Sequence, residues 1–463
     1  MTGRVQSHQK TSEARRASSD AGSIWHPLTQ HQSLLHNPPE QIVEADGCYL
    51  QAKNGKTYLD GVSGIWCVNV GYGRKEIATA ASEQMQRLSY LNPTMTHETG
   101  LALTRKLLEM VDMQGRVFLS SSGSEANEVA LKVAWQYHAQ SGEPSGHQRY
   151  KIISRYRAYH GNTLGALSAT GQAERKIGYG VGAPGFVHIP PPYQYRASQA
   201  LTPTSHGLEC AKILEDTIIY EGPQTIAAFI MEPIISGGGV LIPPDEYLPA
   251  VRTVCNKYGV LLILDEVVSG FGRTGKMFGY EHWGVKPDIF TFGKGIASGY
   301  MPLAATLVRQ EIFDAFLSEN NDMAHFRHIN TYGAHPVAAA VALKNIEILE
   351  NEYLVENSKR QGMYMMRQMD ELNEHPYVGE IRGRGLVAGV ELVSDKDSRA
   401  PLSSDKVGDV IDGCRRRGVI LMRNSNTVPD FSNVVITAPP LIAGEAEIDQ
   451  IVSTLKTSLV EIL

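Results

Sequence analysis

Two residues, Lys294 and Asp265, each follow an apolar run and could together hold one kind of cofactor. Asp265 ends the run that starts at Val260, and Lys294 lies between two glycines just after Ile289–Phe292. In α/β proteins, sites are built at the carboxyl ends of parallel strands. A lysine amine can form a Schiff base with an aldehyde, and a carboxylate can keep a pyridine nitrogen protonated. Pyridoxal 5′-phosphate requires both, so we expect it as the cofactor.

Each of these two residues also has an ordinary interpretation. A carboxylate at the end of a strand can simply cap an exposed loop, and a lysine in a glycine-rich turn is usually a surface lysine. The two together, each at the end of its own apolar run, are much harder to explain by chance. We therefore interpret Lys294 and Asp265 as catalytic residues.

A candidate phosphate site lies at Ser122, Gly123 and Ser124, between a short apolar run and a helical pattern. Ser122 and Glu125 have the spacing of a capping box. A helix N-terminus offers free backbone N–H groups to an anion, and glycine allows close approach. The alternative is an ordinary capped helix, which the motif alone does not exclude.

Tyr159 and His160 follow the apolar run at residues 151–154. An aromatic side chain at a strand end could stack on a flat cofactor ring, although a partly buried turn residue would look the same.

A second motif, Gly270–Gly275, matches G-x-G-x-x-G after a strand. The dinucleotide fingerprint needs a helix opening at these glycines, and the residues that follow show no helical face. We therefore expect a mobile loop beside the site there, not a nicotinamide site.

The surrounding pattern predicts the elements that would position these residues. Residues 40–60 alternate apolar and polar with turn signals, which indicates a small β-meander. From about residue 75, helical stretches alternate with short apolar runs, which favours a mostly parallel sheet with helices on both faces. The expected strands are Val117–Leu119, Lys151–Ser154, Phe186–Ile189, Ile226–Met231, Val260–Leu264 and Ile289–Phe292.

The pattern changes again near residue 335. Helices are expected at Val337–Leu349, 355–373 and Ile448–Ile462, with strands at Leu386–Leu392 and Val434–Thr437. We predict four parts: a disordered tail at 1–22, an N-terminal segment at 23–74 that packs with the small domain, a large cofactor-binding domain at 75–334, and a smaller α+β domain at 335–463.

Composition excludes several classes of protein. The net charge is −6, from 43 basic and 49 acidic residues that are mixed along the chain, so we expect neither a nucleic-acid-binding nor a membrane-binding surface. No apolar run approaches the roughly 20 residues that span a bilayer. Five widely spaced cysteines argue against disulfides and a zinc site, and the first 22 residues lack a secretory signal. We expect a cytoplasmic protein without a metal.

These motifs, in this order, resemble the class III aminotransferases, which are fold-type-I pyridoxal phosphate enzymes. The resemblance runs from about Trp25 to the C-terminus and is closest to the ω-amino acid–pyruvate and taurine–pyruvate aminotransferases. It rests on Trp25-His-Pro-Leu-Thr-Gln, Gly61-Val-Ser-Gly-Ile-Trp66, Ser122-Gly-Ser-Glu-Ala-Asn127, Tyr159-His-Gly-Asn162, Ala169-Thr-Gly-Gln-Ala-Glu-Arg-Lys176, Glu232-Pro, Leu264-Asp-Glu-Val-Val-Ser-Gly270, Phe292-Gly-Lys-Gly295, Thr331-Tyr-Gly-Ala-His-Pro336 and Ala438-Pro-Pro-Leu441.

The resemblance implies a role for each matching residue. Lys294 would bind the cofactor covalently and then move the substrate proton as base and acid. Asp265 would pair with the ring nitrogen, and Tyr159 and Val267 would pack on the two faces of the ring. Other cofactor-binding residues would be Ser122, Gly123, Ser124, His160, Glu232 and Thr331, and the substrate would contact Trp66, Tyr159 and Arg423.

Two of these implied roles concern residues outside the strand ends. Thr331 would complete the phosphate site of a neighbouring subunit, so the resemblance implies a homodimer or homotetramer with its active site at the subunit interface. Arg423 would swing in to bind a substrate carboxylate, because guanidinium suits bidentate carboxylate recognition. A longer segment, Asn424–Asn433, follows it here, and a solvated loop arginine is the alternative.

The expected reaction is a ping-pong transamination. An ω-amino acid, an aminosulfonate such as taurine, or a primary amine would give its amino group to the cofactor, and pyruvate or another keto acid would accept it. The alternative within the fold is a pyridoxal phosphate aminomutase or decarboxylase. A non-catalytic regulator and a dehydrogenase are more distant alternatives, because Lys294 is present and no DNA-binding segment is recognisable.

Overall fold

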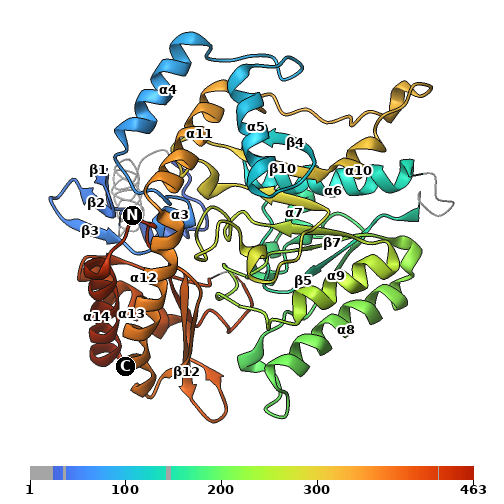
Figure 1. The fold of residues 1–463 in the computed structure, drawn as a ribbon. Coiled ribbons are helices and arrows are strands. Elements are labelled where there is room, and N and C mark those ends of the chain that lie inside the picture. Colours follow the sequence, from blue (N-terminus) through green and yellow to red (C-terminus); the bar gives the residue numbers. More distant parts are fainter. Residues whose placement is uncertain (1–23, 35–37, 142–147, 426) are drawn as a thin grey trace, which may run out of the picture.

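The computed structural model describes residues 24–34, 38–141, 148–425 and 427–463 (Figure 1). The predicted disordered tail, residues 1–22, lies outside the described residues. Within the described residues the chain forms three β-sheets, of seven, five and four strands, surrounded by helices.

The seven-stranded sheet carries the strand ends at which the candidate site residues were expected. Its strand order is β4-β10-β9-β8-β7-β5-β6. Every neighbouring pair is parallel except for the two pairs made by β10. The sheet is therefore mostly parallel, as predicted. The strands are β4 (Gly115–Ser120), β5 (Lys151–Arg155), β6 (Phe186–Ile189), β7 (Ile226–Met231), β8 (Leu261–Asp265), β9 (Ile289–Phe292) and β10 (Ala304–Arg309).

The central strands of this sheet are buried on both faces, which explains why they are almost wholly apolar. Side chains alternate between the faces. Ile152, Ile230 and Ile263 pack with the apolar side of α6 (Gly123–Gln140). Neighbouring residues such as Ile153, Phe229 and Leu262 pack on the opposite face with α8 (Pro203–Glu221) and α9 (Tyr247–Tyr258). Layers of helices thus fix the sheet, and its strand ends are held rigidly.

Helices cover both faces of the sheet, as Figure 1 shows for α8 and α9 at one side. α11 (Pro336–Asn351) packs against α4 and α5. The remaining helices before the small sheet are α2 (His31–Leu34), α3 (Ser63–Trp66), α4 (Lys75–Arg87), α5 (Glu98–Met110), α7 (Leu164–Ala169), α8 (Pro203–Glu221), α9 (Tyr247–Tyr258) and α10 (Gln310–Asp314).

The two smaller sheets join the ends of the chain. One contains β1 (Ile42–Asp46), β2 (Tyr49–Ala52) and β3 (Thr57–Asp60), and β14 (Val419–Ile420) adds to it parallel to β3. The other contains β11 (Val378–Gly383), β12 (Ala388–Asp395), β16 (Val434–Thr437) and β15 (Met422–Arg423), with β13 (Ala400–Pro401) beside β12. α12 (Leu354–Met369), α13 (Ser404–Arg416) and α14 (Glu445–Ile462) complete this part of the molecule. The expected domain boundaries at 74/75 and 334/335 stay predictions.

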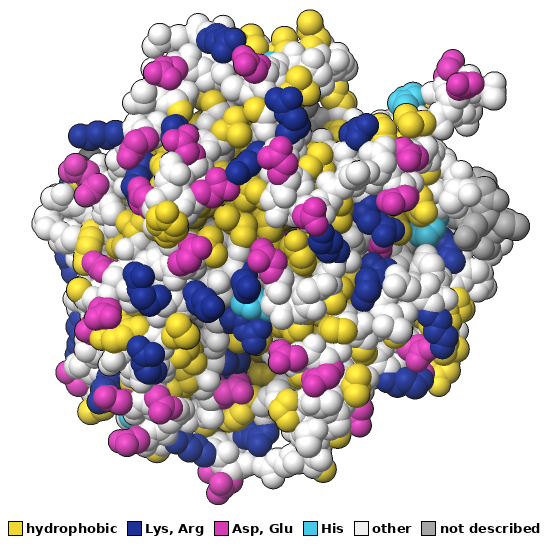
Figure 2. All heavy atoms as spheres, viewed as in Figure 1, with side chains coloured by type: hydrophobic (Ala, Val, Ile, Leu, Met, Phe, Trp, Pro, Cys, Tyr) yellow, Lys and Arg dark blue, Asp and Glu magenta, His cyan; other side chains and the backbone are white. Residues whose placement is uncertain are grey.

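The surface view agrees with the mixed charge of the sequence. Figure 2 shows acidic and basic side chains interspersed over the visible face. Within the described residues no helix is long and apolar enough to cross a membrane, and no group of three or more His, Cys, Asp or Glu side chains is placed to hold a metal ion.

Candidate active site

A cavity of about 150 Å³ lies at the carboxyl ends of the parallel strands, and both Lys294 and Asp265 line it. Asp265 is the last residue of β8, and Lys294 follows β9 by two residues. The structure thus places these two predicted residues in the wall of one cavity. The other lining residues are Trp66, Gly123, Ser124, Asn127, Tyr159, His160, Gly161, Glu232, Gly237, Val267 and Val268.

Asp265 is buried and held by three donors. Its Oδ2 accepts hydrogen bonds from Asn127 Nδ2 at 2.8 Å and from His160 Nδ1 at 2.8 Å, and its Oδ1 accepts from the backbone N–H of Val267 at 3.1 Å. Asn127 is fixed in turn by Thr291 Oγ1, 2.8 Å from Asn127 Oδ1. A carboxylate oxygen can accept more than one bond, so Oδ1 can still accept from a ring N–H in the cavity.

Lys294 is a cation with little to stabilise its charge. Its backbone φ of +45° is unusual for a residue other than glycine. Burial lowers the pKa of the amine, and Asp265 and Glu232 oppose that shift. Its Nζ lies 5.7 Å from the centre of a Trp66 ring. Within the described part of the chain, no side chain or carbonyl accepts a hydrogen bond from this Nζ. A neutral lysine amine is the form that attacks an aldehyde.

The N-terminus of α6 forms the cradle predicted for a phosphate. Ser122 caps the helix: its Oγ accepts from Glu125 N at 3.2 Å, and Glu125 Oε2 accepts from Ser122 N at 3.1 Å. Gly123 and Ser124, which open the helix, line the cavity, whereas Ser122 does not. A Cβ added at Gly123 would lie 3.1 Å from Val267 Cγ1. A glycine therefore lets the start of α6 lie this close to Val267, and the first N–H groups of the helix, which have no partner within it, can meet an anion.

Glu232, the residue after β7, ties two strand ends together. Its buried carboxylate accepts from the backbone N–H groups of Tyr159 and Ser236, each at 3.0 Å. Burial raises the pKa of this carboxyl group. The bond to Tyr159 holds the segment after β5 in place, so the Tyr159 ring remains at the cavity wall.

Two of the predicted site residues lie elsewhere. Thr331 is exposed and does not line the cavity of its own chain; Tyr90 Oη donates to its carbonyl at 3.0 Å. Arg423 lines a different cavity, of about 640 Å³, together with Glu174 and Asp430. Its guanidinium donates to Ser404 Oγ at 2.7 Å. In this structure neither residue faces Lys294.

The segment Gly270–Gly275 differs from the expected mobile loop. As predicted, no helix opens at these glycines. The segment is buried, however, and Arg273 within it donates to Leu386 O at 2.9 Å and to Asn69 Oδ1 at 2.9 Å. Hydrogen bonds to parts of the chain distant in sequence hold it in place, so the expectation of a mobile loop was wrong.

Several residues at the site were missed. Asn127, which holds Asp265, lies one helical turn after Gly123 on α6, and that spacing places both on one face. The sequence therefore contained a signal for Asn127. Gly237, Gln172 and Arg175 follow no strand end directly. Only the folded chain brings Arg175 to Tyr159, and Gly237 to Trp66 and Gln172.

The groups that line the cavity fit pyridoxal 5′-phosphate. An amine, a buried carboxylate with a free acceptor position, a helix N-terminus and an aromatic wall line one small cavity. When bound, this cofactor supplies an aldehyde and an electron-accepting ring.

The family comparisons agree with this fit. The model of the aminotransferase class-III family matches residues 32–459. The chain is 46% identical to an uncharacterized aminotransferase, YhxA, of Bacillus subtilis, with 95% of each chain covered. It is 41% identical to a taurine–pyruvate aminotransferase of Bilophila wadsworthia, with 94% of each covered. A solved aminotransferase of Bacillus anthracis superimposes with a TM-score of 0.92 at 45% identity, covering 100% of both chains. The chain belongs to the class-III aminotransferases: it is a pyridoxal-phosphate-dependent transaminase, which moves an amino group from an amine donor to a keto acid.

Proposed function

We propose that this transaminase takes its amino group from a donor whose amine lies away from any α-carboxylate, and passes it to pyruvate. The donor classes are ω-amino acids, aminosulfonates such as taurine, and primary amines. One observation carries the proposal: no arginine lines the cavity beside Lys294 within the described residues. A donor therefore needs no carboxylate on the carbon that carries its amine. The name of the Bilophila relative supports the same donor and acceptor.

In this proposal each lining residue has one task. Lys294 holds the cofactor and carries the proton that leaves the substrate carbon. Asp265 keeps the ring nitrogen protonated, and Asn127 and His160 hold Asp265 in position. Gly123 and Ser124 bind the phosphate, and Tyr159 and Val267 pack against the ring. Trp66 forms the substrate side of the cavity.

The test is a pair of absorbance spectra of the purified holoenzyme, taken before and after an amine is added without any keto acid. With taurine, β-alanine or a simple amine, we expect the visible band of the lysine-bound cofactor to be replaced by the shorter-wavelength band of the pyridoxamine form. Added pyruvate should restore the first band. Bands that no amine changes, together with release of CO₂ or an isomerised product, would instead support the decarboxylase or mutase.

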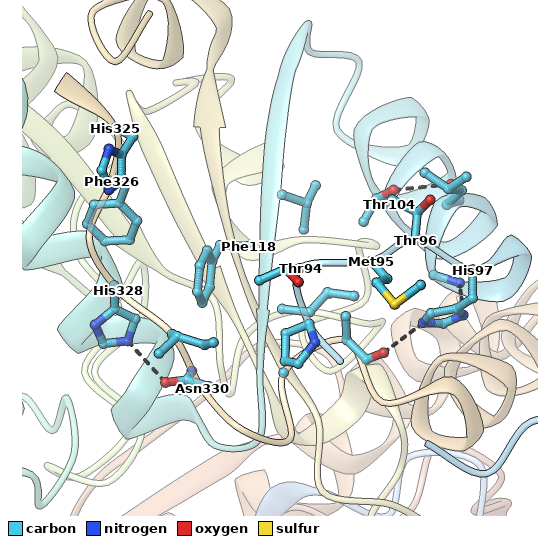
Figure 3. Close-up of a pocket in the computed structure, with 18 of the residues that line it drawn as sticks. Thr94, Met95, Thr96, His97, Thr104, Phe118, His325, Phe326, His328 and Asn330 are labelled. Carbon is cyan, nitrogen blue, oxygen red and sulfur yellow. Dashed lines mark hydrogen bonds between the residues drawn. The ribbon is translucent and has the colours of Figure 1, made fainter. Parts of the chain in front are cut away.

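We further propose that the active unit is a homodimer, at least, that forms over a second cavity. This cavity, of about 530 Å³, is lined mainly by residues 93–104, 117–119 and 325–334. Figure 3 shows Phe326, His328 and Phe118 on one side of it and Met95 and His97 on the other. Large apolar side chains nearby are exposed: Met95, Leu101, Ile329 and Tyr332. An apolar face of this kind is typical of a protein–protein interface.

The position of this cavity favours a second copy of the chain as its occupant. Asn330 Nδ2 donates to Ser120 Oγ at 2.9 Å, and Ser120 ends β4 just before the phosphate cradle. A partner seated here would approach that cradle, and the exposed Thr331 would face outward toward the partner's cradle.

Ile329→Asp should lower the mass measured by sedimentation velocity from the dimer toward the monomer. Tyr220→Asp, an equally drastic change on exposed α8, is the control. A wild-type monomer would contradict the proposal.

We also propose a cytoplasmic location, supported by five free cysteines, four of which are buried. Thiols of this kind are usual in a reducing compartment. Cell fractionation of a tagged chain tests this proposal, and recovery in the membrane or secreted fraction would contradict it.

A further inference from the structure

Arg175 lies on a 3₁₀ turn (Ala173–Lys176) beside the cavity wall, away from the strand ends that supply Lys294 and Asp265. We propose that Arg175 is a substrate-binding residue that holds the acid group, carboxylate or sulfonate, of the amine donor. This inference rests on the proposed function, because it names the part of the substrate that lies far from the reacting amine.

Arg175 is next to the site through two contacts. Its guanidinium carbon lies 4.7 Å from the centre of the Tyr159 ring, and Tyr159 lines the cavity with Lys294. Its Nε donates to Gln172 Oε1 at 2.5 Å. Gln172 is buried, and Gln172 and the edge of Trp66 both lie next to Gly237: a Cβ added at Gly237 would lie 3.4 Å from Trp66 Cη2 and 3.6 Å from Gln172 Nε2. The pair therefore lies against the wall built by Tyr159, Gly237 and Trp66.

Gln172 fixes the direction of the guanidinium. Its own amide is held because Gln172 Nε2 donates to Arg157 O at 3.0 Å. With Nε used by Gln172 and one face packed on Tyr159, the two terminal nitrogens of Arg175 remain. These nitrogens form the parallel pair of donors that matches a carboxylate or a sulfonate.

The terminal nitrogens of Arg175 have no acceptor among the residues that the structure describes, and neighbouring arginines differ in this respect. Arg196 pairs with Glu391 at 2.6 Å, Arg382 pairs with the same carboxylate at 2.8 Å, and Arg423 is bonded to Ser404. Arg175 is also half-buried, and burial lowers the pKa of its guanidinium. A cation that is partly removed from water without a counter-ion is poised to bind an anion.

This placement would divide recognition between the two ends of the substrate. The amine would lie at Lys294, and the acid group would lie at the far side of Tyr159. Donors with some chain length between amine and acid would then fit best, and an amine without an acid group would leave Arg175 unpaired.

The experiment compares matched ligands on the holoenzyme and on Arg175→Ala. Ethanesulfonate and propanoate carry an acid group and no amine, so their dissociation constants, measured by calorimetry, isolate acid binding. β-Alanine and propylamine are a matched pair of donors for the spectroscopic half-reaction. We expect Arg175→Ala to weaken both acids and to raise the KM for β-alanine by roughly 10- to 100-fold. The KM for propylamine should change less than about threefold.

Two further variants separate acid binding from a structural role. Arg175→Lys keeps the charge and should recover part of the affinity for the acids. Lys176→Ala removes the neighbouring positive charge, which is bonded to Ser168 O, and should leave acid binding unchanged.

Three results would overturn the inference: equal losses for β-alanine and propylamine, no loss at all, or a selective loss in Arg423→Ala instead of Arg175→Ala. The proposed function fails separately, if no amine changes the spectrum of the wild-type protein. The dissociation constants of the two acids still test Arg175 in that case.

Discussion

At the scale of single residues, the site holds its carboxylate in fixed contacts and leaves its amine without a partner before any ligand arrives. Asp265 accepts three hydrogen bonds from rigid donors, whereas Lys294 has lost water without gaining an acceptor. The carboxylate is therefore oriented in advance, and the amine is shifted toward its neutral, nucleophilic form.

Replacing Asp265 by Asn should remove the negative charge while keeping the shape of the side chain. The ring nitrogen would no longer be held protonated, so we expect the half-reaction rate with an amine to fall by about 100-fold or more. Rapid-mixing absorbance measures that rate. The circular dichroism spectrum and the thermal midpoint show whether the fold survives. A near-normal rate in a folded variant would remove Asp265 from this role.

The lowered pKa of Lys294 predicts how the apoprotein takes up its cofactor as pH changes. Only the neutral amine forms the covalent bond, and its fraction rises as pH rises through the pKa. The rate at which pyridoxal phosphate attaches, measured from its visible band, should therefore rise with pH and level off. The pH at which this rate is half of its limiting value should lie below the ordinary lysine pKa of 10.5.

Lys294→Ala is the control for this titration. It should bind the cofactor without the visible band, lose it on denaturation, and lack transaminase activity. A midpoint at or above 10.5, or turnover in Lys294→Ala, would contradict the assignment.

Lys294, Asp265 and Tyr159 could be predicted one residue at a time, because each lies at or near a strand end and strand ends are readable from apolar runs. Glu232 was implied only by the resemblance to the family. Arg175 could not be predicted in this way. Its contact with Tyr159 depends on a turn whose path is set by Gln172, and no periodic pattern reports such a path.

At the scale of elements, β4 and α6 act as one unit, in which a strand delivers a helix N-terminus to the cavity. The capping box between Ser122 and Glu125 decides where α6 begins. Because α6 begins at Gly123, the N–H groups of Gly123 and Ser124 are free: the first N–H groups of a helix have no partner within it.

Gly123→Ala should weaken binding of the cofactor phosphate. The new methyl group would lie 3.1 Å from Val267 Cγ1, which is closer than ordinary packing, so Val267 or the start of α6 must move. We expect the dissociation constant of pyridoxal phosphate to rise roughly tenfold, measured by fluorescence titration of the apoprotein. Adding Val267→Ala to Gly123→Ala should recover part of the affinity, because it removes the clash. No change in either variant would show that the cradle is not tightly packed.

Most strands were predictable, and the exceptions have a physical cause. Six strands of the seven-stranded sheet matched apolar runs, but β10 was missed and its antiparallel direction is set by pairing with β4 and β9. β14 has only two residues and exists because it pairs with β3, more than 300 residues earlier in the chain. Short strands of this kind carry no periodicity, so no local pattern can reveal them.

At the scale of the whole molecule, one buried arginine joins the large sheet to the elements around it. Arg273 follows β8 by eight residues and is fully buried. Its guanidinium donates to Leu386 O, Pro439 O, Ser63 Oγ and Asn69 Oδ1. Burial lowers its pKa to about 10, which still leaves it charged at neutral pH. It therefore connects the N-terminal segment, the large sheet and the small sheet through one side chain.

Arg273→Met should destabilise the protein as a whole, because four buried acceptors would lose their donor while the replacement fills most of the volume. We expect a loss of roughly 3–5 kcal/mol in the free energy of unfolding, seen as a lower denaturation midpoint of the apoprotein. Arg384→Met is the matched control, since Arg384 is only half-buried and packs on the Trp283 ring at 5.3 Å. If the two variants lost the same stability, the four hydrogen bonds of Arg273 would not be what joins these parts of the chain. If only Arg273→Met unfolds early, this one cation joins the N-terminal segment and the small sheet to the segment that follows β8.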